Sequence, residues 1–91
     1  MTSRFVITVL GEDKVGIVAA VTRCLADNGA NIVDISQTVL RDLFSMIMLV
    51  SVEDTATHLP NLRESLDRIA DDMGVKVMLQ HEDVFRYMHR V

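Results

Sequence analysis

Two stretches of the sequence are apolar at positions that point to both sides of a β-strand. One runs from Phe5 to Leu10 and the other from Leu43 to Val52. Because successive side chains of a strand point to opposite faces, strands of this composition need apolar cover on both sides. Both are therefore expected in the middle of a sheet. The 91 residues are enough for one domain with a compact core.

Two other segments repeat apolar residues at the three-and-four spacing of an α-helix. The first is expected from Ile17 to Asn28. Asp13 is a suitable cap for its free N–H groups, and Gly29 stands where a helix commonly stops in a left-handed residue. Cys24 lies on the apolar side of this helix and is expected to pack in the core.

The second helical pattern follows a polar connection, residues 53–58. Pro60 is expected in the first turn of this helix, where its missing N–H costs nothing. Gly74 is expected to end the helix. The last ten residues suit a short C-terminal helix laid against the domain, because they carry Val84, Phe85, Met88 and Val91.

Two further strands complete the pattern. Asn31–Leu40 is rich in Ile, Val, Ser and Thr. Only Arg41 and Asp42 separate it from Leu43–Val52, so these two strands should form an antiparallel hairpin. Residues 75–80 alternate apolar and polar side chains and form the fourth strand.

The order of elements is strand, helix, strand, strand, helix, strand. Right-handed crossovers then place two helices on one face of a four-stranded antiparallel sheet. The predicted fold is α+β, a ferredoxin-like βαββαβ sandwich with a short C-terminal helix. The other sheet face carries about half of the apolar strand residues and has no helix over it. Such a surface usually marks an interface, so a homodimer or a higher oligomer is expected.

The charge and the single cysteine limit the class of protein. The formal net charge is −4, which argues against a nucleic-acid partner or an anionic membrane surface. No apolar run approaches the roughly 18 residues of a membrane span. One cysteine cannot form an internal disulfide, and the chain starts without a pattern like a signal peptide. A cytoplasmic protein is expected.

The sequence contains no complete catalytic or metal-binding motif. Gly11 and Gly16 have the spacing of half a P-loop, but Ile17 stands where the lysine belongs. His81, Glu82 and His89 fit no zinc motif and are expected at solvated positions. No nucleophile lies beside a plausible base. The sequence predicts no catalytic residues, no metal and no cofactor.

The segment from Gly11 to Ile17 is the strongest candidate site. It joins a strand to a helix whose first N–H groups point back at the loop with the positive end of the helix dipole. Such a corner suits a small anion, for example a carboxylate. If two subunits pair side by side, Asn31 and Asp34 of one can face this loop of the other. The same residues also have ordinary roles as caps, turns and solvated positions, so both interpretations stay open.

Two segments carry a resemblance to a known family. Gly11–Val18 and Gly29–Thr38 resemble the signature of the ACT domain, a small-molecule sensing module of amino-acid metabolism. The resemblance covers nearly all of residues 1–91, taken as a single ACT domain. The C-terminal extension is similar to that of stand-alone ACT proteins. Related domains occur in the glycine cleavage system repressor.

The resemblance implies a set of ligand-binding residues. The loop from Asp13 to Ile17 would approach a ligand carboxylate through its backbone, and Asn31 would contact the ligand across a dimer interface. Asp34 could meet an amino group or simply line the interface. Two positions depart from the family pattern: Val15 stands where many members carry proline, and Gly11 where serine-sensing members place a histidine. The expected ligand-binding set is Asp13, Lys14, Val15, Gly16, Ile17, Asn31 and Asp34.

Three functions are compatible with these residues. The leading hypothesis is a regulatory domain, not an enzyme, that binds an amino acid or similar metabolite as a homodimer. It would signal to a partner such as an enzyme or regulator of amino-acid metabolism. The alternatives are a protein interaction module that needs no ligand, and an acylphosphatase-like hydrolase dependent on Lys14.

Overall fold

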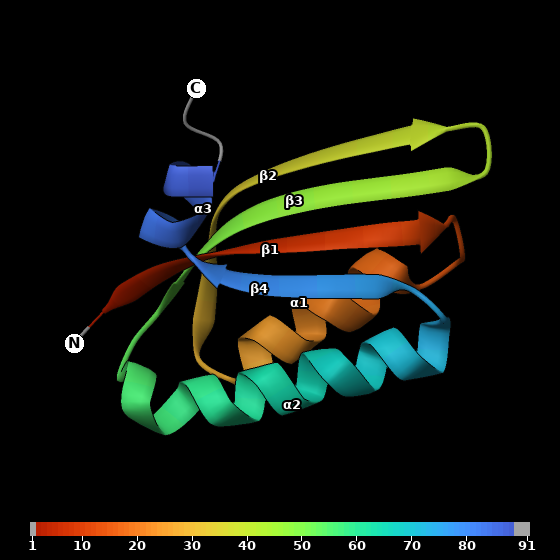
Figure 1. Ribbon diagram of the computed structural model, residues 1–91. Helices are drawn as coiled ribbons and strands as arrows, with labels where there is room; N and C mark the ends of the chain where they lie inside the picture. Colours follow the sequence, from red (N-terminus) through yellow and green to blue (C-terminus); the bar gives the residue numbers. More distant parts are fainter. Residues whose placement is uncertain (1, 89–91) are drawn as a thin grey trace.

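The computed structural model describes residues 2–88 as one α/β sandwich (Figure 1). The predicted order of strands and helices is confirmed, and so is the α+β, ferredoxin-like fold. The elements are β1 (Ser3–Glu12), α1 (Ile17–Asp27), β2 (Ala30–Leu40), β3 (Leu43–Val52), α2 (Thr55–Met73), β4 (Lys76–His81) and α3 (Glu82–Met88). Within the described residues, no helix is both long and apolar enough to cross a membrane.

The four strands are antiparallel in the order β2-β3-β1-β4. The two central strands, β3 and β1, are the two that the sequence marks as apolar on both faces. They pair over their whole length, from Ser3 opposite Val52 to Glu12 opposite Leu43. The hairpin of β2 and β3 turns at Arg41 and Asp42, as expected.

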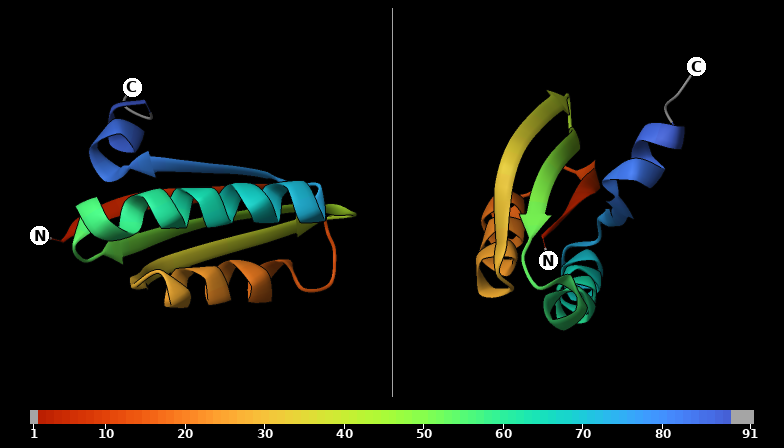
Figure 2. Two further views of the ribbon diagram at one scale, coloured as in Figure 1. Left: turned by 90° about the horizontal axis from the view of Figure 1, so that it is seen from below. Right: turned by 90° about the vertical axis from the view of Figure 1, so that its left-hand side faces the viewer.

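The core lies between the sheet and the two longer helices, α1 and α2, which cover the same face (Figure 2). The apolar side of α1 is buried as its spacing predicts, Cys24 included. The largest fully buried side chains come from the two central strands and both helices: Ile7, Val9, Met46, Met48, Val50, Val52, Ile17, Val21, Leu25, Leu62 and Leu66. This packing fixes α1, and with it the loop that precedes α1, against the sheet.

Gly11 lies inside β1, which continues to Glu12 instead of ending at Leu10. A Cβ at Gly11 would come within 2.8 Å of Val75 Cγ1. A side chain therefore does not fit there without displacing Val75. The loop before α1 is shorter than expected and consists of residues 13–16.

The prediction for the start of α2 is wrong. The helix begins at Thr55, so Pro60 lies within it rather than in its first turn. The N–H groups of Thr57 and His58 both donate to the carbonyl of Asp54, at 2.9 and 3.1 Å. This first turn is largely exposed and polar, so it lacks the apolar periodicity that marks the rest of the helix.

A bulge in β2 decides which way its polar residues point. The pairing with β3 shifts between Ile32 and Asp34, which leaves Val33 as the extra residue. Asn31 is opposite Ser51 and Asp34 is opposite Leu49. Because those partners are two residues apart on β3, Asn31 and Asp34 share one side of the sheet.

That side is the face opposite α1 and α2, here called the open face. Its residues on the two central strands include Val6, Thr8, Leu10, Leu43, Ser45, Ile47 and Leu49. The short helix α3 lies on this face (Figure 2). The expected C-terminal helix is thus present, while Val91 and His89 lie outside the described residues. The expectation that no helix covers this face is wrong at one end, where Val6 is only 5% exposed.

Glu82 anchors α3 to the sheet. Its carboxylate pairs with Arg4 of β1 at 3.2 Å and with Arg86 of α3 at 3.4 Å. The residue is 9% exposed, so the expectation of a solvated Glu82 is wrong. His81 is more exposed and packs edge-on against Phe5, with ring centroids 5.4 Å apart.

Glu82→Gln is expected to loosen α3. The substitution removes the charge that holds the two arginines and should lower the free energy of unfolding by about 1–3 kcal/mol. The amides of α3 should exchange faster while those of β3 stay protected. Chemical denaturation and hydrogen exchange measure both effects.

Glu64→Gln is the matched control. Glu64 forms the same i,i+4 pair with Arg68, at 3.0 Å, but both side chains are about two-thirds exposed. Its loss should cost at most about 0.5 kcal/mol. Equal, small effects of the two substitutions would contradict the anchoring role of Glu82.

Candidate functional site

The loop of residues 13–16 turns the chain from β1 into α1 (Figure 1). Gly16 is the N-cap residue of α1 and has a left-handed backbone with φ of 93°. No side chain caps the helix, so the prediction that Asp13 does so is wrong. The turn brings the chain into the helix through the conformation of Gly16, which leaves Asp13 exposed to solvent.

The start of α1 has backbone N–H groups without strong hydrogen-bond partners. The N–H of Ile17 reaches the carbonyl of Lys14 only at 3.5 Å, a long and weak hydrogen bond. A Cβ at Gly16 would meet nothing within 4 Å, so there is open space beside the turn. The free N–H groups and the positive end of the helix dipole therefore face accessible space. Val15 is fully exposed beside them.

Two hydrogen bonds hold the loop in place. The N–H of Asp13 donates to the carbonyl of Asp42, in the β2–β3 turn, at 2.7 Å. The Nζ of Lys14 donates to the carbonyl of Met73, in the last turn of α2, at 2.8 Å. The ammonium of Lys14 thus lies at the negative end of the α2 dipole. The side chain of Lys14 positions the loop, and the backbone of the loop is what faces solvent.

Asn31 and Asp34 lie at the opposite end of the sheet from this loop. Asn31 is opposite Ser51, which in turn is opposite Arg4 near the start of β1. The loop follows Glu12, eight residues further along β1, or roughly 26 Å at 3.3 Å per residue. Within one chain the structure therefore brings Asp13 to Ile17 together and keeps Asn31 and Asp34 apart from them. Asp34 is exposed, and its Oδ1 accepts a hydrogen bond from the N–H of Ile35 at 2.9 Å.

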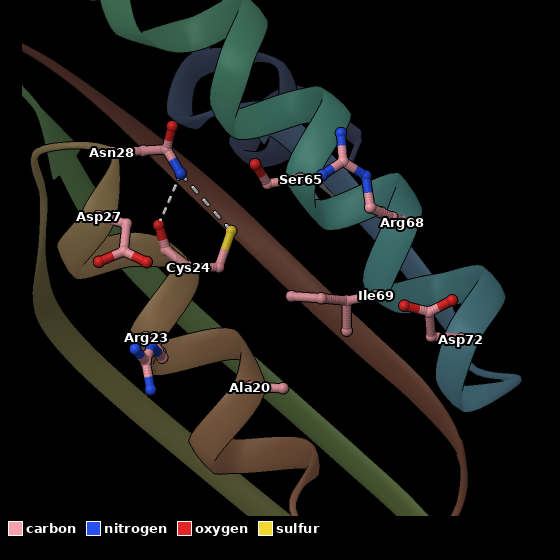
Figure 3. Close-up of a pocket in the computed structure, with 9 residues that line it drawn as sticks. All are labelled: Ala20, Arg23, Cys24, Asp27, Asn28, Ser65, Arg68, Ile69 and Asp72. Carbon is pink, nitrogen blue, oxygen red and sulfur yellow. Dashed lines mark hydrogen bonds between the residues drawn. The ribbon is translucent and has the colours of Figure 1, made fainter.

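A groove between α1 and α2 was not anticipated from the sequence (Figure 3). It has a volume of about 330 Å³, and Cys24, Asn28 and Ser65 lie around it. Asn28 Nδ2 donates to the carbonyl of Cys24 at 2.8 Å and lies 3.8 Å from its Sγ. Burial raises the pKa of the Cys24 thiol, so the thiol stays protonated and is a poor nucleophile near neutral pH. In the sequence, the groove is indicated only by polar residues on the facing sides of the two helices.

These features define an α/β sandwich with an uncapped helix start behind a tethered glycine loop. Residues 3–80 match the sequence model of the ACT domain. The chain belongs to the ACT domain family, whose members are typically ligand-binding regulatory domains. The resemblance of the two glycine-containing segments is thereby confirmed.

Individual relatives agree with this assignment. The chain is 47% identical over 89 residues to a UPF0237 protein of Methanocaldococcus jannaschii, covering 98% of this chain and 99% of the relative. An ACT domain protein from Streptococcus pneumoniae is 38% identical, with a TM-score of 0.77 over 91% of this chain and 93% of that one. A structure named for a glycine cleavage system transcriptional repressor has a TM-score of 0.80 and 25% identity. That similarity covers 89% of this chain but only 46% of the repressor chain.

Lys14→Met is expected to loosen the loop. The substitution removes the hydrogen bond to the carbonyl of Met73, and the hydrogen-bonded amide of Asp13 should exchange about fivefold faster, the equivalent of about 1 kcal/mol. Lys14→Arg is the matched control, because it keeps a cationic donor at the same position. Hydrogen exchange of the Asp13 amide by NMR compares the two variants. Identical exchange rates in Lys14→Met and the wild type would contradict the role of Lys14 in holding the loop.

Proposed function

We propose that this protein is a regulatory domain that binds an amino acid or a similar small metabolite between two subunits. It works in the cytoplasm as a homodimer and passes the signal to an enzyme or regulator of amino-acid metabolism. The observation that carries this proposal is the separation of the two halves of the site. The loop of residues 13–16 lies at one end of the sheet, and Asn31 and Asp34 lie at the other end, on an exposed edge strand.

The edge strand β2 is suited to pair with a second chain. Each residue of β2 after Ala30 is exposed, and the apolar ones include Ile32, Val33, Ile35 and Val39, which are 39 to 51% exposed. A long, apolar edge strand is a template for pairing, and soluble proteins rarely leave one open to solvent. Side-by-side pairing of two β2 strands would extend the sheet through both subunits.

Two-fold pairing of this kind brings the two halves of the site together. In an antiparallel pair, the start of one β2 lies beside the end of the other. The end of β2 leads into the Arg41–Asp42 turn, which holds Asp13 through the carbonyl of Asp42. Asn31 and Asp34 of one subunit then approach the loop of its partner.

The combined site would match an amino-acid zwitterion. The helix N–H groups of one subunit favour the carboxylate. The carboxylate of Asp34 and the amide oxygen of Asn31 in the other subunit are acceptors for the ammonium. Membership of a family of ligand-binding regulatory domains supports this assignment.

Ligand and assembly would then be linked thermodynamically. A ligand that contacts both subunits binds the dimer better than the separate chains and shifts the population toward it. The bound state presents its partner protein with a dimer of fixed geometry. If the ligand raises the affinity of the domain for its partner protein by some factor, the partner must raise the affinity for the ligand by that same factor.

A thermal melt against a panel of amino acids tests the proposal. A ligand present at 100 times its Kd adds about 2.7 kcal/mol to the folded state, and each kcal/mol raises the midpoint of a domain this small by roughly 4 to 8 °C. Gly16→Asp should abolish the shift, because it places a negative charge at the proposed anion site. The left-handed backbone of Gly16 also disfavours any side chain there. Asn31→Ala should reduce the shift by removing the acceptor.

The matched control is Asn61→Ala, which removes the same amide from an exposed position on α2. It should leave the shift unchanged. A panel without any shift would contradict the ligand proposal and favour the interaction module. A shift that survives Gly16→Asp would remove the loop from the site.

A further inference from the structure

The open face is covered at one end only. Val6 and Leu10 lie on the same strand and the same face, yet Val6 is 5% exposed beneath α3 and Leu10 is 40% exposed. The end around Leu10, here called the far end, contains a hollow of about 430 Å³. Leu40 and Leu43 border this hollow and are 68% and 58% exposed.

The outer side of α3 presents a complementary apolar surface. Glu82 and Phe85 face the sheet across a crevice that Val6 also lines. Val84 and Tyr87 lie on the other side of the helix, three residues apart, and are 51% and 78% exposed. Each chain therefore carries both an apolar hollow and an apolar helix face.

We propose that two copies of this chain pair through their open faces, with α3 of each copy seated in the far-end hollow of the other. A two-fold axis parallel to the sheet and across the strands exchanges the two ends of the face. The covered end of one copy then lies over the uncovered end of its partner. The contact is isologous and closed, so it forms a pair and not a chain of molecules.

One charge pair and the exposed apolar side chains favour this occupant. Lys76 is opposite Leu10 in the sheet and so flanks the hollow. Asp83 precedes Val84 on α3 and its side chain is 80% exposed. Glu12 is opposite Leu43 on the same face, so one basic and one acidic residue border the hollow. In each exchanged contact, Asp83 of one copy lies near Lys76 of the other. The apolar side chains brought together from each copy are Leu10, Leu40, Leu43, Ile47, Met78, Val84 and Tyr87.

This pairing does not require the proposed ligand site. Side-by-side pairing uses the hydrogen-bonding edge of β2, and the face-to-face contact is centred on the far end of the open face, so one copy can use both. Asn31 and Asp34 also lie on the open face, but at the end away from the hollow. Four chains would then assemble with two kinds of two-fold contact. The helix that makes the second contact lies beyond residues 3–80, the part that matches the ACT domain.

A charge-reversal experiment tests the exchanged contact. Leu43→Lys and Val84→Glu each place a charge in the apolar contact, so each should halve the mass measured by light scattering after size exclusion. The double variant sets the new lysine of one copy against the new glutamate of the other, and the mass should return. Circular dichroism checks that each variant is folded. Asn61→Lys on α2 is the control for an added charge.

Ile35→Lys separates this contact from pairing along β2. Ile35 lies on the helix side of the edge strand, so its substitution should disrupt edge pairing and leave the open-face pair intact. A mass that is unchanged by Leu43→Lys and Val84→Glu would overturn the proposal. So would halving by both variants without recovery in the double variant, which would mean that the hollow and the helix meet different surfaces.

Discussion

The antiparallel pairing of β1 with β3 is the constraint on which the rest of the structure depends. These central strands pair from Ser3 opposite Val52 to Glu12 opposite Leu43. A slip of one residue would turn the buried side chains of β1 to the other face. The same register sets the end of β1 beside the β2–β3 turn. The hydrogen bond from Asp13 to Asp42, and therefore the location of the loop, follows from the way the core packs.

The placement of both long helices on one face has a consequence for assembly. It leaves the far end of the open face without a covering helix among the described residues, while the strand order leaves β2 as an exposed edge. Neither surface stabilises an isolated chain, because apolar side chains that stay exposed to water add no hydrophobic free energy to folding. In the proposed assembly, the edge completes a ligand site and the open face joins pairs of dimers.

Much of the fold could be predicted from the sequence because its signals are local. Two-sided apolar strands identified β1 and β3, and helical spacing identified α1. The start of α2 was missed because residues 55–58 form an exposed polar turn, which has no apolar period to detect. The β2 bulge at Val33 was also not predicted from the sequence, because a bulge depends on how two strands pair.

The long-range contacts of the site and of α3 could not be predicted in this way. Lys14 bonds to Met73, 59 residues away, and Arg4 pairs with Glu82 from the opposite end of the chain. No spacing rule connects such partners, because tertiary packing alone brings them together. The sequence did mark the glycine loop correctly as the link between the first strand and the first helix. It could not tell that Lys14 would hold that loop to α2.

The most direct test of a site shared between subunits is a mixing experiment with two defective chains. Gly16→Asp and Asn31→Ala protomers are unfolded together, refolded as an equimolar mixture, and titrated with the amino acid that binds the wild type. Random pairing should restore about a quarter of the wild-type sites, since each mixed dimer has one intact site and one doubly altered site. Gly16→Asp refolded alone should not bind, and Asn31→Ala refolded alone should bind only weakly. A mixture that binds no better than the separate variants would contradict the claim that the loop of one subunit and Asn31 of the other form a single site.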